Sequence, residues 1–569
     1  MKTPICSRRT VLALMLALAA APYFIGLGSS SLWDSNEAFY AETPRRMIET
    51  GDYLNPSFND RPRFNKPPLS YWVVAASYKV FGVSEAAERL PIALGAMVLL
   101  ATAFLIGRAS YTIEAGFFAA LGMALSPRFL MFSRRIIIDL YLAMFMGLTL
   151  LFFVLAERET SRRRLYLALM YASAGLGFLT KGPVAIALPA IVFLLYLIMT
   201  RGLGRLRHMM LPVGALIVAA IILPWYIAIY IEHGWVYIET FFLKDNISRY
   251  TEPVWGPRRG ILFYIPVLIG DLFPWSLFLV AAIWMLARRA LGRKESALSG
   301  IKRDGLSGQA RIPLLLALWV AVIVVFFSFS SNKEDLYILP VYTAASALVG
   351  GFLSSYALDR KGLDPFPARV ATVGLGLIIS LGGAAVVYLF DRESTGHQIG
   401  GASVIGYLAL AGGLISAGLA LVGKNFAGLS WTGVTILAVN WVFVIWALPD
   451  FERYKPVRPF CEVIKREASR DAMVGYYRFA SPSMVFYLGR PVFEYYDEDE
   501  LRAALTSEKE VYCIMTLQDY EAIRGSLQGG SNILASNPIF QVKLRFILEK
   551  REPAQVVLVS NRVGASSLQ

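Results

Sequence analysis

The chain has 569 residues, of which 56% are hydrophobic and only 17% are charged. A soluble globular protein carries nearer a quarter charged residues, which argues against that class. The apolar residues lie in long runs such as 211–231 and 314–329, and a helix crosses a bilayer in about 20 such residues. The net charge of +14 does not indicate a nucleic-acid partner, because the basic residues fall mainly in short loops between apolar runs.

The first apolar run, near residues 10–28, follows Arg8 and Arg9. A basic start and a short apolar core are also typical of a cleaved signal peptide, but we interpret this run as a retained first helix. Residues 29–86 then form an outer loop. Its apolar stretch 67–82 is short and begins with two prolines, so we expect a helix in the membrane interface rather than a span.

Further spans complete a total of about thirteen, as judged from apolar length. We expect them near 87–107, 111–130, 139–156, 164–180, 183–200, 209–231, 261–286, 312–330, 336–357, 368–390, 402–422 and 429–448. Basic residues follow the fourth, sixth, eighth, tenth and twelfth spans, as the positive-inside rule requires of cytoplasmic loops. They lie at 158–164, 201–207, 288–311, 360–361 and 424. The N-terminus is therefore expected inside and the C-terminus outside, with the stretch 287–311 as a flexible inner linker.

Residues 449–569 are polar and follow a transmembrane domain at 1–448. Apolar runs at 485–488, 511–515 and 556–559, with a helix-like stretch at 498–505 between them, predict a small soluble α/β domain. Cys461 and Cys513 lie in this region. Outside the cytoplasm they could form a disulfide, and two buried thiols are the alternative.

Unusual polar residues gather in the outer loops of this topology. Basic residues there break the positive-inside rule, which makes them functional candidates. A single Lys or Arg could simply extend toward lipid headgroups. Together the basic loops suit a lipid phosphate or diphosphate. The candidates are Asp34, Asn36, Glu37, Tyr40, Asn65, Lys66, Tyr71, Asp139, Lys181, Asn246, Arg249, Lys333 and Tyr337, with Arg134 and Arg135 beside Asp139.

Asp34 and Glu37 lie just after the first span and have two interpretations. They could cap the helix expected at 38–49 and interact with its dipole. Alternatively, one of them acts as the general base that removes a proton from an acceptor hydroxyl or amine. The basic cluster would then neutralise a phosphate leaving group.

Several motifs follow one another through roughly the first 350 residues. They are Asn36-Glu37, Tyr40-Ala41-Glu42, Arg45-Arg46-Met47, Gly51-Asp52, Lys66-Pro67-Pro68, Phe178 to Pro183, Pro224-Trp225-Tyr226 and Tyr337 to Pro340. In order and spacing the chain resembles the GT-C membrane glycosyltransferases related to protein O-mannosyltransferases and lipid A aminoarabinose transferases.

The resemblance implies an all-α polytopic fold with two juxtamembrane helices in the first outer loop. It also implies a polyprenyl-phosphate sugar donor and transfer on the periplasmic face of a bacterial inner membrane, with Lys66 and Arg249 as phosphate contacts. The acceptor would be a lipid, a protein or a glycan.

Three asparagines depart from the family pattern. Asn36 stands where relatives often carry the presumed base, and Asn65 and Asn246 stand where an acidic residue and a histidine are associated with a metal. With only three histidines in the chain, a multi-histidine site is not expected. We predict no tightly bound zinc, and a loosely held divalent cation stays open as the alternative.

The sequence thus predicts a membrane glycosyltransferase with Glu37 or Asp34 as base and Asp139 in support. Lys66, Lys181, Arg249 and Lys333 would surround the phosphate, and Tyr40, Tyr71 and Tyr337 would line the groove. A transporter or flippase of a lipid-linked anion is one rival, although such proteins carry charged or broken-helix sites near the bilayer midplane. A non-catalytic envelope assembly protein is the other.

Overall fold

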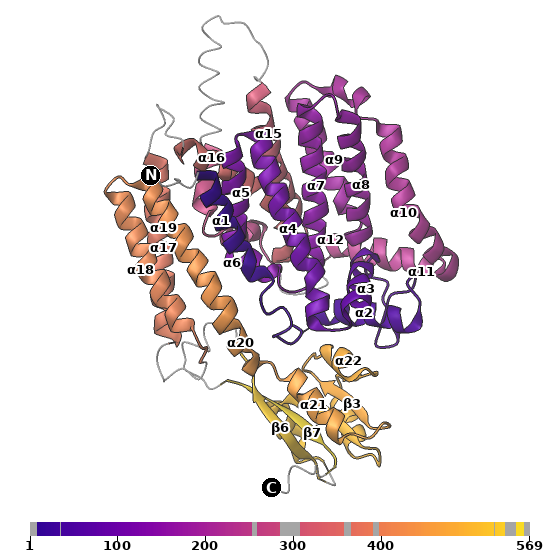
Figure 1. Ribbon diagram of the computed structural model, residues 1–569. Helices are drawn as coiled ribbons and strands as arrows, with labels where there is room; N and C mark the ends of the chain where they lie inside the picture. Colours follow the sequence, from indigo (N-terminus) through magenta and orange to yellow (C-terminus); the bar gives the residue numbers. More distant parts are fainter. Residues whose placement is uncertain are drawn as a thin grey trace, which may run out of the picture.

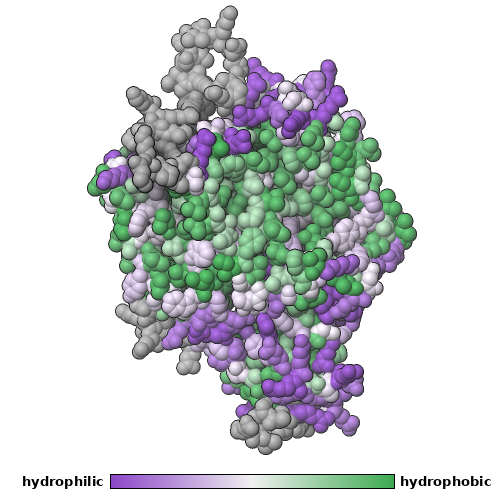
Figure 2. Space-filling model, viewed as in Figure 1, coloured by the Kyte–Doolittle hydropathy of each residue, from purple (hydrophilic) through white to green (hydrophobic). Residues whose placement is uncertain are grey.

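The computed structural model describes residues 8–34, 36–252, 259–284, 308–357, 366–390, 398–527, 530–540 and 553–562. A bundle of long helices forms most of this part, and a small sheet lies below it (Figure 1). Figure 2 shows an apolar band across the visible face of the bundle with polar residues gathered above and below it, as a membrane-spanning protein requires. The expected linker at 287–311 lies outside the described residues except for 308–311, which begin a helix.

Each of the expected spans coincides with helical structure. In the described residues, eight helices are individually long and apolar enough to cross a membrane, and a ninth span arises if the helices Ile261–Asp271 and Ser276–Trp284, bent by 111°, are counted as one. The bundle consists of α1 (Arg8–Ala20), α4 (Glu85–Ser110), α5 (Ile113–Leu125), α7 (Ile138–Arg158), α8 (Arg163–Lys181), α9 (Val184–Met199), α10 (Leu211–His233), α13 (Tyr264–Asp271), α15 (Gly308–Ser328), α16 (Tyr342–Ala357), α17 (Phe366–Phe390), α18 (Ala402–Leu421) and α19 (Asn425–Val442).

Some spans differ in detail from the expectation. The first is shorter than 10–28, because α1 ends at Ala20 and a single 3₁₀ turn, η1 (Ala21–Tyr23), follows it. The last is longer, because α19 continues through η6 (Phe443–Ala447), α20 (Leu448–Asp450) and η7 (Phe451–Tyr454). The mainly helical bundle and the C-terminal sheet together confirm the predicted fold class.

Small residues let α17 and α18 pack closely. A Cβ atom on Gly376 would lie 2.6 Å from the Gly413 carbonyl oxygen, and one on Gly383 would lie 2.4 Å from the Leu410 nitrogen. Glycine is needed at these contacts because lipid chains supply no hydrophobic drive between helices, and association depends on close backbone approach.

The first outer loop contains α2 (Asn36–Thr50), a small hairpin of β1 (Ser57–Phe58) and β2 (Arg61–Pro62), and α3 (Leu69–Phe81). Helix α3 starts after Pro68 and is capped after Phe81 by Gly82, which has a φ of 78°. With 13 residues it is too short to span a bilayer. Helices α2 and α3 lie at the same end of the bundle as the C-terminal sheet (Figure 1), which we call the loop end.

The region after Tyr454 folds as an α/β unit. Its five-stranded sheet has the order β4-β3-β5-β7-β6, with β3 parallel to β4 and β5 and the other pairs antiparallel. The run 511–515 falls in β5 and 556–559 in β7, whereas 485–488 belongs to a helix. The elements are α21 (Val457–Glu467), β3 (Met473–Tyr477), α22 (Ser483–Leu488), β4 (Phe493–Tyr495), α23 (Glu498–Leu505), β5 (Val511–Thr516), α24 (Leu517–Arg524), β6 (Asn532–Pro538) and β7 (Gln555–Ser560).

The two cysteines of this region are buried and free. Cys461 belongs to the apolar core that α21 shares with one side of the sheet, and Cys513 belongs to the core on the other side. Of the two alternatives left open by the sequence, the buried thiols are therefore correct.

Candidate functional site

Three cations converge on two carboxylates at the loop end. Lys66, in the loop before α3, forms an ion pair with Asp245 of η3 (Glu239–Ser248). Arg249 of α12 (Arg249–Thr251) lies on the same face one turn later, with Nη1 3.2 Å from Asp245 Oδ1. Lys181, the last residue of α8, pairs with Asp139 in the first turn of α7. We call these five residues the charged cluster.

The charged cluster is largely shielded from solvent. The side chain of Lys66 is 12% exposed and that of Asp245 is 18% exposed. Burial lowers the pKa of Lys66 to about 8, although Asp245 opposes the shift, and the neighbouring Lys181 and Arg249 add to it. Three like charges in one partly buried place are costly unless anions balance them. The cluster is therefore suited to take up further negative charge.

Aromatic side chains surround the cluster. The rings of Tyr40 and Tyr71 stack at 5.4 Å, and Arg63 Nε donates a hydrogen bond to the Tyr71 hydroxyl at 3.2 Å. Burial raises the pKa of both tyrosines, so their hydroxyls stay protonated. On the other side, Lys181 Nζ lies 4.8 Å from the centre of the Tyr337 ring, where η5 (Asp335–Val341) begins the span of α16.

Two of the three unusual asparagines adjoin the cluster. The Asn65 carbonyl oxygen accepts a hydrogen bond from Lys66 Nζ at 2.8 Å, while Asn65 Oδ1 is buried without a partner. Asn246 Nδ2 donates to the Phe241 carbonyl oxygen at 2.7 Å. Asn246 thus stabilises the π-helical segment η3 that carries Asp245. No group of three or more His, Cys, Asp or Glu side chains suitable for a metal occurs among the described residues.

An apolar groove of about 240 Å³ adjoins the charged cluster. Its walls come from α3, α4, α7 and α8. Thr180 of the wall precedes Lys181, and Tyr141 follows Asp139 by two residues. The groove thus lies between helices of the bundle, and its lining residues include close sequence neighbours of Lys181 and Asp139. Its lining is Leu69, Ser70, Val73, Pro91, Leu94, Gly95, Val98, Tyr141, Met144, Phe145 and Thr180.

Glu37 lies outside the charged cluster, in a buried ion pair. Its side chain is 1% exposed and that of Arg89 is 2% exposed. Arg89 Nε and Nη2 each donate to a different carboxylate oxygen at 2.8 Å, and the amides of Trp33 and Ile136 donate as well. Burial alone would raise the pKa of Glu37, but Arg89 and these hydrogen bonds outweigh it and hold the pKa below its ordinary value. Both oxygens are thus already engaged.

Asp34 is engaged by the C-terminal region. Its two oxygens accept hydrogen bonds from the Ser483 amide at 2.7 Å and the Ser483 hydroxyl at 2.6 Å, at the start of α22. Asn36 is exposed at the first residue of α2. Among the described residues Lys333 forms no ion pair with Asp139 or Asp245, and its Nζ donates to the Ser330 carbonyl oxygen of its own loop at 2.5 Å.

Asp245 is the member of the cluster that was absent from the sequence-based candidates. The sequence does contain a pattern that points to Asp245. Asp245 precedes Asn246 and stands four residues before Arg249, a spacing that places two side chains on one helical face. Its pairing with Lys66, 179 residues away in sequence, leaves no local pattern.

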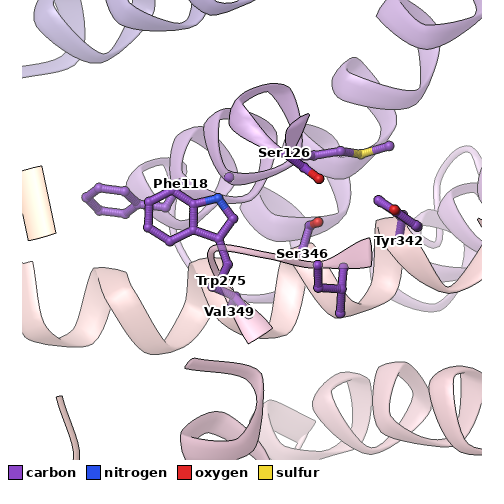
Figure 3. Close-up of a pocket in the computed structure, with 9 residues that line it drawn as sticks. Phe118, Ser126, Trp275, Tyr342, Ser346 and Val349 are labelled. Carbon is purple, nitrogen blue, oxygen red and sulfur yellow. The ribbon is translucent and has the colours of Figure 1, made fainter. Parts of the chain in front are cut away.

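A second cavity lies inside the bundle, away from these residues. Figure 3 shows Ser126, Trp275, Tyr342 and Ser346 around it, together with apolar neighbours. Ser126 and Tyr342 both donate to the Asp271 carbonyl oxygen at 2.9 Å. The cavity volume of about 10 Å³ suffices for one water molecule at most. None of its lining side chains is charged, so it offers nothing to bind a phosphate and does not compete as a substrate site.

Comparisons with known proteins agree with this geometry. The family model described as dolichyl-phosphate-mannose-protein mannosyltransferase matches residues 65–227. An undecaprenyl phosphate-alpha-4-amino-4-deoxy-L-arabinose arabinosyl transferase of Pseudomonas fluorescens is 28% identical over 419 residues, which cover 72% of this chain and 67% of that protein. A protein of Aquifex aeolicus, described as uncharacterized, is 30% identical over 341 residues, which cover 59% of this chain and 63% of that protein.

Among solved structures, the crystal structure of ArnT from Cupriavidus metallidurans bound to undecaprenyl phosphate matches with a TM-score of 0.77. The match covers 98% of this chain and 99% of that one at 21% sequence identity, so the two share a fold over almost their full length. The apo form of the same protein gives a TM-score of 0.76. Together with the spans, these matches indicate a multi-pass inner-membrane protein that is similar to the GT-C glycosyltransferases of the protein mannosyltransferase and aminoarabinose transferase group.

Proposed function

We propose that this protein transfers a sugar from a polyprenyl-phosphate carrier to an envelope acceptor at the periplasmic face of the inner membrane. The observation that carries the proposal is the convergence of Lys66, Lys181 and Arg249 beside the apolar groove. A long isoprenoid with a phosphate at one end presents the matching chemistry. The described relatives that act on undecaprenyl phosphate-linked aminoarabinose support this donor class.

The cations change partners when the donor binds. In the free protein Asp245 pairs with both Lys66 and Arg249, and Asp139 pairs with Lys181, which leaves one positive charge unbalanced. A donor phosphate offers these cations stronger charge-assisted hydrogen bonds. In the transfer step the bond between the sugar carbon and the phosphate oxygen breaks, and the electron pair remains on the phosphate. Charge stabilisation of that leaving phosphate is the main contribution of the cluster.

Asp139 is the best-placed base for a hydroxyl acceptor. Asp245 uses Oδ1 for Arg249 and Oδ2 for Lys66, whereas Asp139 uses only Oδ1 for Lys181. The second oxygen of Asp139 can accept the acceptor proton while the acceptor oxygen bonds to the sugar carbon. The unpartnered Asn65 Oδ1 supplies an acceptor for a sugar hydroxyl in the same place. In this proposal Glu37 and Asp34 stabilise the fold and take no part in the transfer step.

Sugar release from a radiolabelled polyprenyl-phosphate donor by the purified full-length protein, with membrane lipid extract as acceptor, tests the proposal. Lys66→Gln is expected to reduce turnover about 10²-fold, as for loss of one donor to a developing anion. Asp139→Asn should reduce it by about 10²-fold or more. Lys244→Gln is the matched control, because Lys244 neighbours Asp245 but is 66% exposed and paired with Glu239. Normal turnover in both Lys66→Gln and Asp139→Asn would contradict the proposal.

A further inference from the structure

A second group of basic side chains lies at the loop end, outside the charged cluster. Arg134 and Arg135 stand in the loop between α6 (Pro127–Phe132) and α7. With Arg89 they line a small enclosed cavity, which we call the Arg134/Arg135 pocket. Its remaining walls are Gly26, Leu27, Ser30, Trp33, Met131 and Leu448.

This pocket carries uncompensated positive charge. Arg89 is balanced by Glu37, but within the described part of the chain neither Arg134 nor Arg135 has a carboxylate partner within ion-pair distance. Arg134 is 7% exposed. Its terminal nitrogens donate to the carbonyl oxygens of Pro22 and Gly26, and its Nε atom has no hydrogen-bond partner. The Nε atom of Arg135 also lacks a partner. A buried, unpaired guanidinium is costly and creates a demand for an anion.

Trp33 brings a further cation to the pocket. The Arg135 guanidinium lies 5.6 Å from the centre of the Trp33 ring, and Lys455 Nζ lies 3.9 Å from it. The same indole stacks on Phe451 at 5.6 Å. Aromatic rings of this kind are favoured at the boundary between the membrane and water. The pocket therefore sits where lipid headgroups lie.

The size of the pocket limits what can enter it. Its volume of about 10 Å³ accepts a group about as large as a water molecule. One oxygen of an oxyanion fits, while the half-buried Arg135 at the rim can hold the other oxygens. Two of the wall residues, Gly26 and Leu448, have exposed apolar side chains just before them in the sequence. Phe24 and Ile25 precede Gly26, Ile445 and Trp446 precede Leu448, and all four are exposed.

Phe24 and Ile25 lie in the turn after η1, and Ile445 and Trp446 lie in η6, so the two apolar strips follow α1 and α19. The Trp441 indole donates to the Leu18 carbonyl oxygen at 3.0 Å, which holds α19 against α1. A basic pocket between two exposed apolar strips matches a phosphate that is attached to hydrocarbon chains. We propose that the Arg134/Arg135 pocket binds the phosphate of an anionic membrane lipid, at a site separate from the donor cluster.

Native mass spectrometry of the full-length protein in detergent tests this site. The probes are phosphatidic acid, diacylglycerol with the same chains, and inorganic phosphate alone. We expect phosphatidic acid to bind and diacylglycerol not to bind. Arg135→Gln should weaken binding of phosphatidic acid about tenfold through loss of charge-assisted hydrogen bonds. Arg453→Gln is the matched control, since Arg453 is 46% exposed and already paired with Asp450, and its affinity should equal that of the wild type.

A second variant guards against misfolding of the first. Arg134→Lys keeps the charge but loses the planar fork of the guanidinium, so it should also weaken binding while the thermal midpoint stays close to that of the wild type. Unchanged affinity in both pocket variants overturns the proposal. The proposal is also overturned if diacylglycerol binds as well as phosphatidic acid, or if Lys66→Gln loses binding while Arg135→Gln keeps it. Full displacement of phosphatidic acid by an equal concentration of inorganic phosphate would overturn it too.

Discussion

At the scale of single residues, charge pairing decides which carboxylates are available for chemistry. Glu37 accepts four hydrogen bonds and has no oxygen to spare. Asp139 has one, because only Oδ1 contacts Lys181. Sequence proximity to the first span favoured Glu37 and Asp34, but their partners Arg89 and Ser483 lie 52 and 449 residues away. Such pairings are set by the tertiary fold and have no local signature.

Replacement of Glu37 should therefore change stability more than chemistry. Glu37→Gln leaves Arg89 as a buried charge without a counter-ion, and breaking a buried pair in this way costs about 3–5 kcal/mol. We expect a clearly lower thermal midpoint, with turnover per folded molecule kept within a few-fold. Asp60→Asn is the control, because Asp60 is 52% exposed in its pair with Arg46. A normal thermal midpoint combined with lost turnover would return Glu37 to the role of base.

The lowered pKa of Lys66 predicts a pH dependence of donor binding. The phosphate binds the protonated amine, and the pKa of about 8 lies below the ordinary lysine value. Protonated Lys66 is therefore lost as pH rises through about 8, so affinity for polyprenyl phosphate should fall between about pH 7 and pH 9. Equilibrium binding at several pH values measures this. Lys66→Arg should remove the decline, because arginine stays protonated throughout this range.

At the scale of elements, η3 determines whether the charged cluster can assemble. This π-helical segment carries Phe241 and Asp245, and the Phe241 ring packs directly on Gly182, next to Lys181. Gly182 has a φ of 96°, and a Cβ atom there would lie 2.6 Å from Phe241 Cζ. One glycine thus fixes the distance between the segments that provide Lys181 and Asp245.

Gly182→Ala should consequently disturb the cluster. Both the positive φ and the clash with Phe241 oppose the methyl group, at a cost of about 1–3 kcal/mol. We expect a lower thermal midpoint and reduced donor affinity. Gly204→Ala is the matched control, because Gly204 has open space around its Cα and a φ outside the strained range. If donor affinity is the same in both variants, η3 does not depend on Gly182.

The helices of the bundle were predictable because each is a long apolar segment between charged loops. The helix at 498–505 was predicted with the same bounds that α23 has. The apolar run 485–488 was misleading, because it lies on a short helix that packs against α2 and α21. Over only four residues, the apolar pattern of a buried helix cannot be distinguished from that of a buried strand. The sequence allowed Lys66, Lys181 and Arg249 to be predicted as cations of the outer loops. Their grouping around Asp139 and Asp245 could not be predicted, because it depends on how separate helices pack in the fold.

At the scale of the whole molecule, the C-terminal region is attached to the first outer loop along its length. Leu32 donates its amide to the Tyr487 hydroxyl at 2.7 Å, and Lys455 donates to Ser30 and Ser31. The Asn59 side chain forms two hydrogen bonds of 2.8 Å with the backbone of Val492. Figure 1 shows α22 directly below α2. The loop that contributes Lys66 is thus held between the bundle and the sheet.

Loss of this attachment should loosen the loop. Asp34→Ala removes both acceptors of Ser483, so amide hydrogens in residues 29–34 and in α22 are expected to exchange at least several-fold faster. Hydrogen–deuterium exchange measures this directly. Asp471→Ala serves as control, because Asp471 is exposed in the turn before β3. Equal exchange in the two variants would mean that Asp34 does not secure the junction.

The contact between Asp34 and Ser483 also has a consequence for biogenesis. During synthesis the first outer loop emerges early, but its partners are translated 449 residues later. The helices that carry Lys181 and Asp139 can insert and pair while the ribosome is still at work. The first loop, by contrast, must wait until the C-terminal region has been synthesised and folded. A chain that stops before residue 483 would have a packed bundle, but its first loop would lack the hydrogen bonds from Ser483 to Asp34.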